Sequence, residues 1–317
     1  MKKIFCAVLA IAAMASCSNE YTIDTQKQAI AFSETFVNNG TRADYSQLDK
    51  PVTKFKVYGT LTGTGALAGT TVQVFEGADV ENPAGYYNSE TGVYDDSKAW
   101  ICNETQYWVP NTVYNFAAIV DGVAEDTDGL PETILFTVAD GVNNKDLLYA
   151  TATASVDNDG VVTGSNMQNG LVAFSFDHLL SKVGFTVTSN IGTGYSIKVT
   201  GITVTGVAQD GIYTVGATTP WAKNGTTTTT LTFGSEGAYE TRQILPVNQT
   251  LNVTIAYDIY YGETKISAAT KSGTVTKDFV KNTVYNITAT ITMTNKIQFT
   301  VKEVIGWNTP VVDAPLQ

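Results

Sequence analysis

The chain has 317 residues, 43% of them hydrophobic, and a formal net charge of −11 at pH 7. This length is enough for one large or two medium domains, each with its own core. The acidic charge argues against nucleic acid or anionic surfaces as partners, because the chain would repel phosphates. Apart from the start of the chain there is no long apolar run, and that first run is too short to span a bilayer as a helix.

The first seventeen residues predict export. Two lysines precede an apolar run that ends at Ala15-Ser16-Cys17. A charged start, a short apolar segment and a small-residue cut site make a secretory signal peptide, here residues 1–16. A cysteine directly after the small pair resembles the lipobox of bacterial lipoproteins, in which the thiol is acylated. We therefore expect acylation at Cys17, which would anchor the chain to a membrane; ordinary cleavage near Ala15 is the alternative.

The other cysteines limit the redox chemistry. Cys6 leaves with the signal peptide and Cys17 is the expected acylation site, so Cys102 stands alone. No intramolecular disulfide is then possible in the mature chain. We interpret Cys102 as a buried, inert thiol.

The first predicted strand lies near the N-terminus. One of its faces carries Ile30, Phe32, Glu34 and Phe36 at a spacing of two. The loop after it, residues 38–44, is polar and contains glycine, so proteases can reach it. This loop holds Arg42, one of two arginines in the chain. A trypsin-like cut after Arg42 would release the strand together with the lipidated N-terminus; a solvated loop arginine is the alternative.

The rest of the chain is a series of short strands separated by turn residues. The strands are rich in Val, Ile, Thr, Tyr and Phe, as a half-buried pleated surface favours. We expect them at 54–58, 71–75, 113–119, 133–138, 147–153, 171–176, 183–187, 197–204, 226–233, 250–261 and 284–293. Gly, Asn and Asp pairs supply the turns, and the one helical hint, 177–182, is short. The predicted fold class is therefore all-β.

An internal repeat predicts two domains. The motif Asn-Thr-Val-Tyr-Asn occurs at 111–115 and again at 282–286. Each copy leads into a long apolar strand, as duplicated sandwiches would show. The polar stretch 155–169 is the expected linker. This gives an N-terminal sandwich at 43–165 and a C-terminal sandwich at 166–317.

A strand near the C-terminus presents a face similar to that of the first strand. Its residues at a spacing of two are Ile297, Phe299, Val301, Glu303, Ile305 and Trp307. Both faces read apolar, apolar, Glu, apolar, so both strands suit the same kind of slot. The chain itself could fill such a slot with one of its strands, and a neighbouring copy could fill it with the other, by strand addition to an open sheet edge. The alternative is that each is an ordinary edge strand of its own domain.

Residues that could carry catalysis are few. His178 is the only histidine, and its apolar surroundings suit a structural ring better than a catalytic one. Acidic clusters at 121–128 and 157–159 do not complete a calcium loop, so hairpin turns explain them better. We predict neither an enzyme nor a bound cofactor or metal.

Several motifs in a characteristic order resemble the fimbrillin-like family. They are the lipobox, the strand ending in Phe-Val-Asn at 36–38, Thr-Arg-Ala at 41–43, Phe-Lys-Val-Tyr-Gly at 55–59, Tyr-Trp-Val-Pro at 107–110 before Tyr-Asn-Phe at 114–116, and Phe-Asp-His-Leu-Leu-Ser-Lys-Val at 176–183. The resemblance spans essentially the whole chain. It implies two tandem transthyretin-like, Greek-key β-sandwich domains.

The resemblance also implies a function. Members of this family are type V pilus subunits, exported as lipoproteins, cut by an arginine-specific protease and polymerised by strand exchange. Matched by position, Cys17 is the acylated residue, the bond between Arg42 and Ala43 is the processed bond, and 17–42 is a propeptide with the removable strand. The donor strand falls within 297–312.

The partners and location follow from the same resemblance. They are other pilus subunits, the protease, the outer membrane through the lipid, and a host or bacterial surface ligand; the location is the outer membrane, the cell surface and the pilus. A shaft, tip or anchor role stays open, because some relatives fold this tail back on themselves.

Two other function classes also stay open. A surface lipoprotein that binds glycans could stack them on Trp100, Trp108, Trp221 and Trp307, although the first two sit in strand contexts that suggest a core. A glycoside hydrolase would need two carboxylates across a cleft, and the sequence gives no reason to choose a pair.

Overall fold

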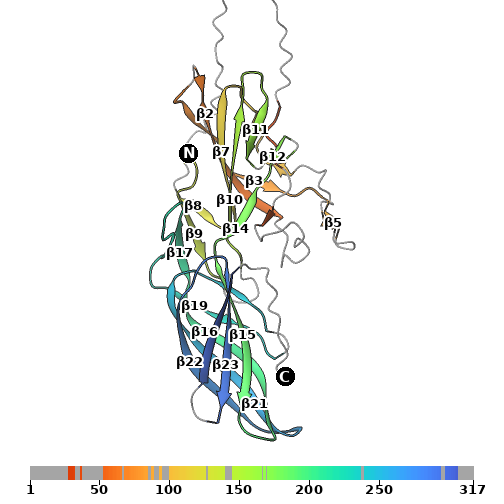
Figure 1. The fold of residues 1–317 in the computed structure, drawn as a ribbon, viewed down its shortest axis with the longest axis vertical. Coiled ribbons are helices and arrows are strands. Elements are labelled where there is room, and N and C mark those ends of the chain that lie inside the picture. Colours follow the sequence, from red (N-terminus) through yellow and green to blue (C-terminus); the bar gives the residue numbers. More distant parts are fainter. Residues whose placement is uncertain are drawn as a thin grey trace, which may run out of the picture.

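The computed structural model describes residues 28–32, 36–37, 53–65, 68–84, 87–88, 93–94, 100–125, 128–139, 145–165, 167–168, 170–236, 239–293 and 297–305. Over these residues every regular element is a β-strand. The strands form two sandwiches stacked end to end, the N-terminal one at the top of Figure 1 and the C-terminal one at the bottom. The predicted all-β class with β-sandwich domains is confirmed. Within the described ranges, no helix has the length and apolarity to cross a membrane.

The strands are, in chain order, β1 (Phe36–Val37), β2 (Lys54–Gly63), β3 (Thr71–Glu81), β4 (Tyr87–Asn88), β5 (Val93–Tyr94), β6 (Ile101–Cys102), β7 (Thr112–Val120), β8 (Val123–Glu125), β9 (Thr133–Thr137), β10 (Leu148–Val156), β11 (Val162–Ser165), β12 (Met167–Gln168), β13 (Leu171–Val172), β14 (Ser175–His178), β15 (Ser181–Asn190), β16 (Tyr195–Ala208), β17 (Asp210–Thr214), β18 (Trp221–Lys223), β19 (Thr228–Thr232), β20 (Arg242–Ile244), β21 (Asn248–Tyr261), β22 (Thr264–Asp278), β23 (Thr283–Thr292) and β24 (Ile297–Ile305).

The N-terminal sandwich is built on one eight-stranded sheet. Its order is β1-β14-β10-β7-β2-β3-β6, with β11 beside β10. β10 alternates between buried residues and residues that are half-buried or exposed, and its alanines face inward. These small side chains leave room for the phenylalanine cluster of the core, so the sequence pattern of β10 sets which face is buried.

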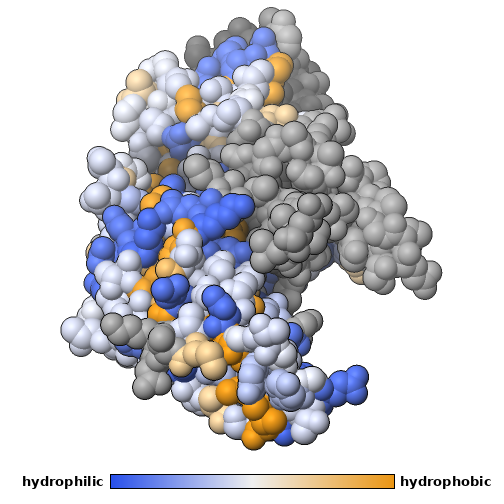
Figure 2. Space-filling view, turned by 60° about the horizontal axis from the view of Figure 1, so that its bottom comes forward, coloured by the Kyte–Doolittle hydropathy of each residue, from blue (hydrophilic) through white to orange (hydrophobic). Residues whose placement is uncertain are grey.

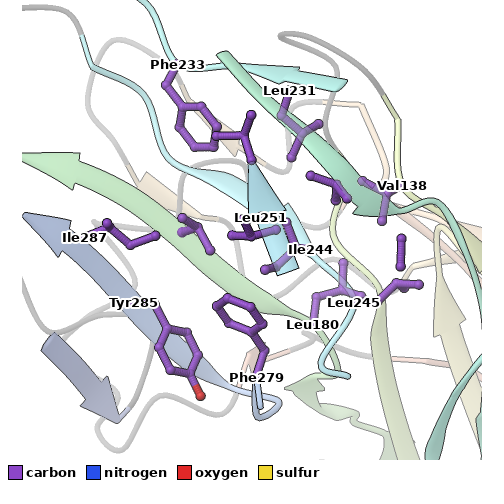
Figure 3. Packing of buried hydrophobic residues seen from close by; sticks show 14 of the residues in the cluster. Val138, Leu180, Leu231, Phe233, Ile244, Leu245, Leu251, Phe279, Tyr285 and Ile287 are labelled. Carbon is purple, nitrogen blue, oxygen red and sulfur yellow. The ribbon is translucent and has the colours of Figure 1, made fainter. Parts of the chain in front are cut away.

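The C-terminal sandwich has two facing sheets. One has the order β20-β15-β23-β24 and the other β19-β16-β21-β22. Figure 3 shows the core between them, where side chains such as Phe279 and Tyr285 pack edge to face at 4.8 Å between ring centroids. A third sheet, β18-β17-β9-β8, lies between the two sandwiches (Figure 1).

The two cores do not divide at the predicted boundary, 165/166. β14 pairs with β10, and Phe174 and Phe176 lie in the N-terminal core. The next buried apolar residues along the chain, Leu179 and Leu180, lie in the C-terminal core. The polar stretch that suggested a linker belongs mainly to the β10–β11 hairpin, whose exposure says nothing about which core the next apolar run joins.

Two further elements also differ from the expectation. The helical hint at 177–182 is wrong: β14 ends at His178 and β15 begins at Ser181. β9 precedes the last strands of the N-terminal sheet, yet it pairs with β17, and its Ile134 and Phe136 lie in the C-terminal core. The two domains therefore share a packed junction.

The repeated motif has the same geometry in both copies. Asn111 and Asn282 have positive φ angles of 58° and 55°, which asparagine tolerates better than most residues. Tyr114 and Tyr285 are fully buried, and each hydroxyl accepts the N–H of a valine five residues earlier, at 3.0 Å and 2.9 Å. The repeat is thus one structural device used at the start of β7 and of β23.

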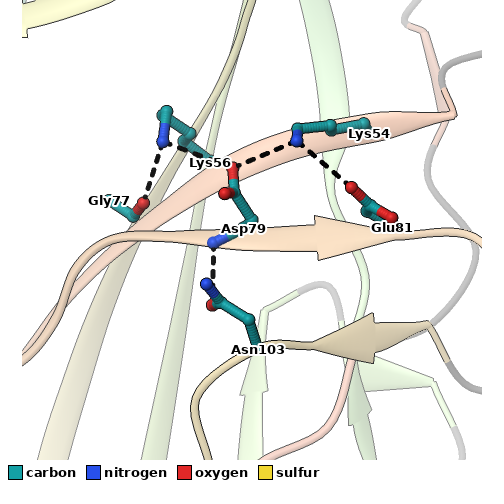
Figure 4. A network of polar contacts seen from close by, with 6 residues as sticks. All are labelled: Lys54, Lys56, Gly77, Asp79, Glu81 and Asn103. Carbon is teal, nitrogen blue, oxygen red and sulfur yellow. Dashed lines mark hydrogen bonds and ion pairs between the residues drawn. The ribbon is translucent and has the colours of Figure 1, made fainter.

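An ion-pair cluster lies on the exposed face of β2 and β3 (Figure 4). Lys56 Nζ lies 3.2 Å from Asp79 Oδ1, and Lys54 Nζ lies 3.1 Å from Glu81 Oε1. The hydrogen bond from Lys56 lowers the pKa of Asp79. Such exposed pairs add little stability. Asn103 satisfies a backbone group at the edge of β3, since its Oδ1 accepts the Asp79 N–H at 3.0 Å. This bond covers the edge of β3 beside the short β6.

Candidate functional site

Residues 28–32 form the middle of a small second layer in the N-terminal sandwich. On one side they pair antiparallel with Tyr107 and Trp100, and on the other side parallel with Val172 of β13. A segment near the start of the chain therefore lies between two segments that come much later in the sequence.

Backbone hydrogen bonds fix the segment on both sides. Three join it to residues 100–108 and one joins it to β13. They are Ile30 N to Gln106 O at 2.8 Å, Trp108 N to Gln28 O at 3.0 Å, Trp100 N to Phe32 O at 3.0 Å and Val172 N to Ala31 O at 2.9 Å. Removing the segment would leave these N–H and C=O groups unpaired, which is costly in a buried place. Only another extended strand could satisfy all of them.

The side chains of the segment are part of the core. Ile30 is 4% exposed and Phe32 is fully buried. The Phe32 ring contacts four other phenylalanine rings at centroid distances of 5.7 to 6.4 Å, namely Phe55, Phe75, Phe116 and Phe174. Burial of such a side chain contributes ~1.5–3 kcal/mol, and each aromatic pair adds more. Phe32 is therefore the centre of the N-terminal aromatic cluster.

Phe32→Ala should lower the free energy of unfolding of the N-terminal domain by ~3–5 kcal/mol, because the vacated space lies among rigid rings. Urea denaturation of the chain without its signal peptide measures this. Val123→Ala is the matched control, since Val123 is 64% exposed, and it should change stability by no more than about 0.5 kcal/mol. Equal effects of the two substitutions would contradict the assignment.

The chain then passes to the other layer of the sandwich. β1 pairs parallel with β14 at the edge of the eight-stranded sheet, with Phe36 opposite Ser175. The side chains of Glu34 and Phe36 lie outside the described residues, as do Cys17, Arg42 and Ala43. Their predicted roles stay predictions.

The C-terminal strand lies in its own domain. β24 pairs antiparallel with β23 from Ile297, opposite Ile291, to Ile305, opposite Thr283. It ends its sheet, so within the described residues it has a strand neighbour on one side. Ile297, Phe299 and Val301 are half-buried against the C-terminal core. The side chain of Ile305, and all of Trp307, lie outside the described residues.

Contacts with β22 of the facing sheet also hold β24. The Phe299 ring lies over Gly273, where an added Cβ would come within 2.6 Å of Phe299 Cε2. Lys277 and Glu303 form an ion pair across the two strands. Lys271 Nζ donates to Thr292 O at 2.8 Å, at the end of β23. Gly273 on β22 thus leaves the space that is filled by Phe299, the largest described apolar side chain of β24.

Comparison with known proteins decides the family. The family model for fimbrillin-like proteins matches residues 41–307. The chain belongs to the fimbrillin-like family. The resemblance predicted from the motifs is therefore confirmed. No curated protein matches the sequence.

Two of the solved structures that align with this fimbrillin-like chain share its fold. Crystal structures of two proposed cell adhesion proteins, from Bacteroides uniformis and Bacteroides ovatus, each align with a TM-score of 0.51 and 14% identity. The first alignment covers 88% of this chain and 97% of the other, and the second covers 89% and 98%. The fimbrial anchor protein Mfa2 from Porphyromonas gingivalis aligns over 89% of this chain and 98% of its own, at 10% identity and a TM-score of 0.35.

The second arginine of this fimbrillin-like chain is enclosed. Arg242 is 5% exposed in β20, pairs with Val183 of β15 and forms an ion pair with Glu240. Its guanidinium lies 6.0 Å from the centre of the Phe233 ring. A protease that needs an extended, accessible arginine cannot reach this bond while the domain is folded.

The tryptophans of the glycan hypothesis are not surface platforms where the structure describes them. Trp100 is 4% exposed and Trp108 is 7% exposed, as their strand contexts suggested. Trp221 is half-buried, and its Nε1 donates to Leu179 O at 2.8 Å. Trp307 lies outside the described residues.

The remaining reactive side chains are buried or half-buried. His178 is 5% exposed and its Nδ1 lies 2.6 Å from Asp146 Oδ2, where burial raises the pKa of Asp146. Cys102 is half-buried, and burial raises the pKa of its thiol, which favours the protonated form. Among the described residues, no cluster of three or more His, Cys, Asp and Glu side chains could hold a metal ion.

Proposed function

We propose that the protein is a structural, non-catalytic subunit of a type V pilus that polymerises by strand exchange. One observation carries the proposal: residues 28–32 are the hydrogen-bonded middle strand of a buried layer, yet they precede Arg42 in the chain. A strand in this place completes the N-terminal core. A single cut after Arg42 would turn that strand into a separate, replaceable piece.

The proposed pathway begins with export as a lipoprotein. Removal of residues 1–16 and acylation of Cys17 hold the subunit at the outer membrane. An arginine-specific protease then cuts between Arg42 and Ala43. The released propeptide carries the removable strand, with Ile30, Phe32 and Phe36.

The covalent link between the first strand and the rest of the chain, here called the tether, explains why the cut has to come before assembly. While attached, the strand competes for its slot at an effective concentration of roughly millimolar. A neighbour's tail at about micromolar concentration is outcompeted about a thousandfold, which corresponds to ~4 kcal/mol. Two strands with such similar faces cannot differ enough to overcome this, so the tether has to be broken.

The incoming strand is the C-terminal tail of a neighbouring copy or a homologous subunit. Its apolar face consists of Ile297, Phe299, Val301, Ile305 and Trp307. An end strand loses hydrogen bonds on one side when it leaves, which makes β24 easier to release than a middle strand. The buried arginine in β20 supports a single processing site, since it leaves Arg42 as the one candidate.

A second role is supported by the pairing of β24 with β23 along its length. A subunit that keeps its tail could accept a strand without donating one. Such a subunit would end or anchor a fimbria, or remain a monomeric surface lipoprotein that binds a host or bacterial ligand.

Mass spectrometry of material purified from the cell surface separates the two roles. A polymerising subunit predicts an N-terminus at Ala43 in high-mass, SDS-resistant ladders. An intact, acylated Cys17 on a monomer would contradict polymerisation and favour the anchor or binder.

A further inference from the structure

Exposed apolar side chains gather at the end of the C-terminal sandwich that points away from the N-terminal domain. β15 and β23 run from the junction to this end, and β16 and β22 start from it. The side chains are Tyr195, Tyr261, Ile266 and Met293, which are 42%, 58%, 51% and 75% exposed. Figure 2 turns this end toward the viewer and shows apolar residues toward the bottom of the view.

Two tyrosines form the centre of this surface. Tyr195 and Tyr261 are opposite each other on β16 and β21, with ring centroids 5.1 Å apart and ring planes at 57°. Gly262 N donates to Gly194 O at 3.1 Å and joins the two loops. The Tyr261 ring lies against Gly194, where an added Cβ would come within 2.9 Å of Cε2. The Tyr261 ring therefore contacts both the Tyr195 ring and the Gly194 backbone without a ligand.

The surface continues from the tyrosines to Met293. An added Cβ at Gly192 would lie 3.8 Å from Met293 Sδ and 3.9 Å from Tyr195 Cδ2. The glycines keep side chains away from the rings. Loops rich in Tyr, Gly, Thr, Ser and Asn at one end of a sandwich suit recognition, because tyrosine offers a rigid amphipathic face and small polar residues offer hydrogen bonds.

Charge and area select the kind of ligand. The segments 190–197, 259–266 and 290–293 carry two charged residues of opposite sign, Glu263 and Lys265, in a chain of net charge −11. Such a body repels anions, and its tip offers a nearly neutral surface. The exposed parts of the two tyrosines add up to about one whole side chain, ~150–250 Å². That is far below the ~800 Å² per partner of a stable protein interface, but it can cover one or two sugar rings.

We propose that the Tyr195–Tyr261 end binds a neutral saccharide. The C–H face of a sugar ring stacks on the tyrosines, while the phenol hydroxyls and loop hydroxyls such as that of Thr193 hydrogen-bond the sugar hydroxyls. The site needs no strand exchange, so it would serve adhesion in a polymer or in a monomer.

Saturation-transfer NMR and calorimetry on the mature chain test this site. The probes are maltohexaose, mannopentaose, triacetylchitotriose and lactose, with sialyllactose and a heparin hexasaccharide as anionic comparisons. At least one neutral probe should bind, and Tyr195→Ala or Tyr261→Ala should weaken it by about tenfold, the size of one lost ring contact. Tyr261→Phe should keep most of the affinity. Tyr107→Ala is the matched control, since Tyr107 is 45% exposed in the other domain.

Several results would overturn the proposal. They are no binding of any neutral probe, tighter binding of the anionic probes, or an equal loss in the Tyr107→Ala control. A concentration-dependent dimer that Tyr261→Ala abolishes, without sugar binding, would assign the surface to a second copy instead. Unchanged thermal unfolding of the variants shows that each result reports on binding. Because the probes are tested on monomeric protein, failure here leaves strand exchange untouched.

Discussion

Arg42→Ala should abolish polymers and leave full-length, lipidated monomers on the cell. The uncut chain keeps residues 28–32 in their slot, and the tether favours them about a thousandfold over a neighbour's tail. The buried strand makes this retention strong, since both its edges are hydrogen-bonded and Phe32 is enclosed by four rings. The measurement is the high-mass ladder in unheated SDS gels of surface protein, with the N-terminus read by mass spectrometry.

Two controls sharpen this experiment. Thr41→Ala changes the neighbouring residue and should leave the ladder intact. Arg242→Lys keeps a cation near Glu240 and should also leave processing unchanged, because the bond after residue 242 lies in a folded strand. Normal polymers from the Arg42→Ala variant would contradict processing at this bond.

Deleting residues 297–317 should produce subunits that accept a strand but cannot donate one. Added to wild-type subunits, they should shorten the polymers in proportion to their fraction, because each one ends a chain. The distribution of ladder lengths measures this. If the deletion had no effect on length, the tail would not be the donor.

Gly273→Val is the matched variant for the deletion, since it displaces the tail without removing it. A side chain at 273 takes the place of the Phe299 ring. β24 therefore loses its packing contact with β22 but keeps its own apolar face. The variant should therefore donate at least as well as wild type. Loss of donation in both variants would point to damage of the C-terminal domain rather than to loss of a donor.

Much of the fold could be predicted because strand patterns are local. The alternation of Ile30 with Phe32 and of Ile297 with Phe299 indicated which faces are apolar, and these faces pack against cores. β-branched and aromatic residues at period two identify such faces whatever the partner strand is. The repeated Asn-Thr-Val-Tyr motif was informative for the same reason, since its tyrosine hydroxyl accepts a hydrogen bond from a backbone N–H only five residues earlier.

What could not be predicted depends on which distant segment each strand meets. Nothing local separates Phe176, in one core, from Leu179, in the other. The place of residues 28–32 between Trp100 and Val172 is also invisible in the sequence, because it rests on pairs far apart in the chain. The tyrosine pair at the distal end was missed because the pattern places Tyr261 at the end of one predicted strand and Tyr195 just before another, but does not show that they face each other.

The most direct measurement follows the exchange itself. Protein cut after Arg42 is mixed with a synthetic peptide of residues 297–312 that carries a photoreactive phenylalanine at position 299. The account predicts that the peptide displaces fragment 17–42 and crosslinks to the segments around Trp100 and Val172, which now flank residues 28–32. A fragment that stays bound, with a peptide that crosslinks nowhere in the N-terminal domain, would contradict strand replacement as the means of assembly.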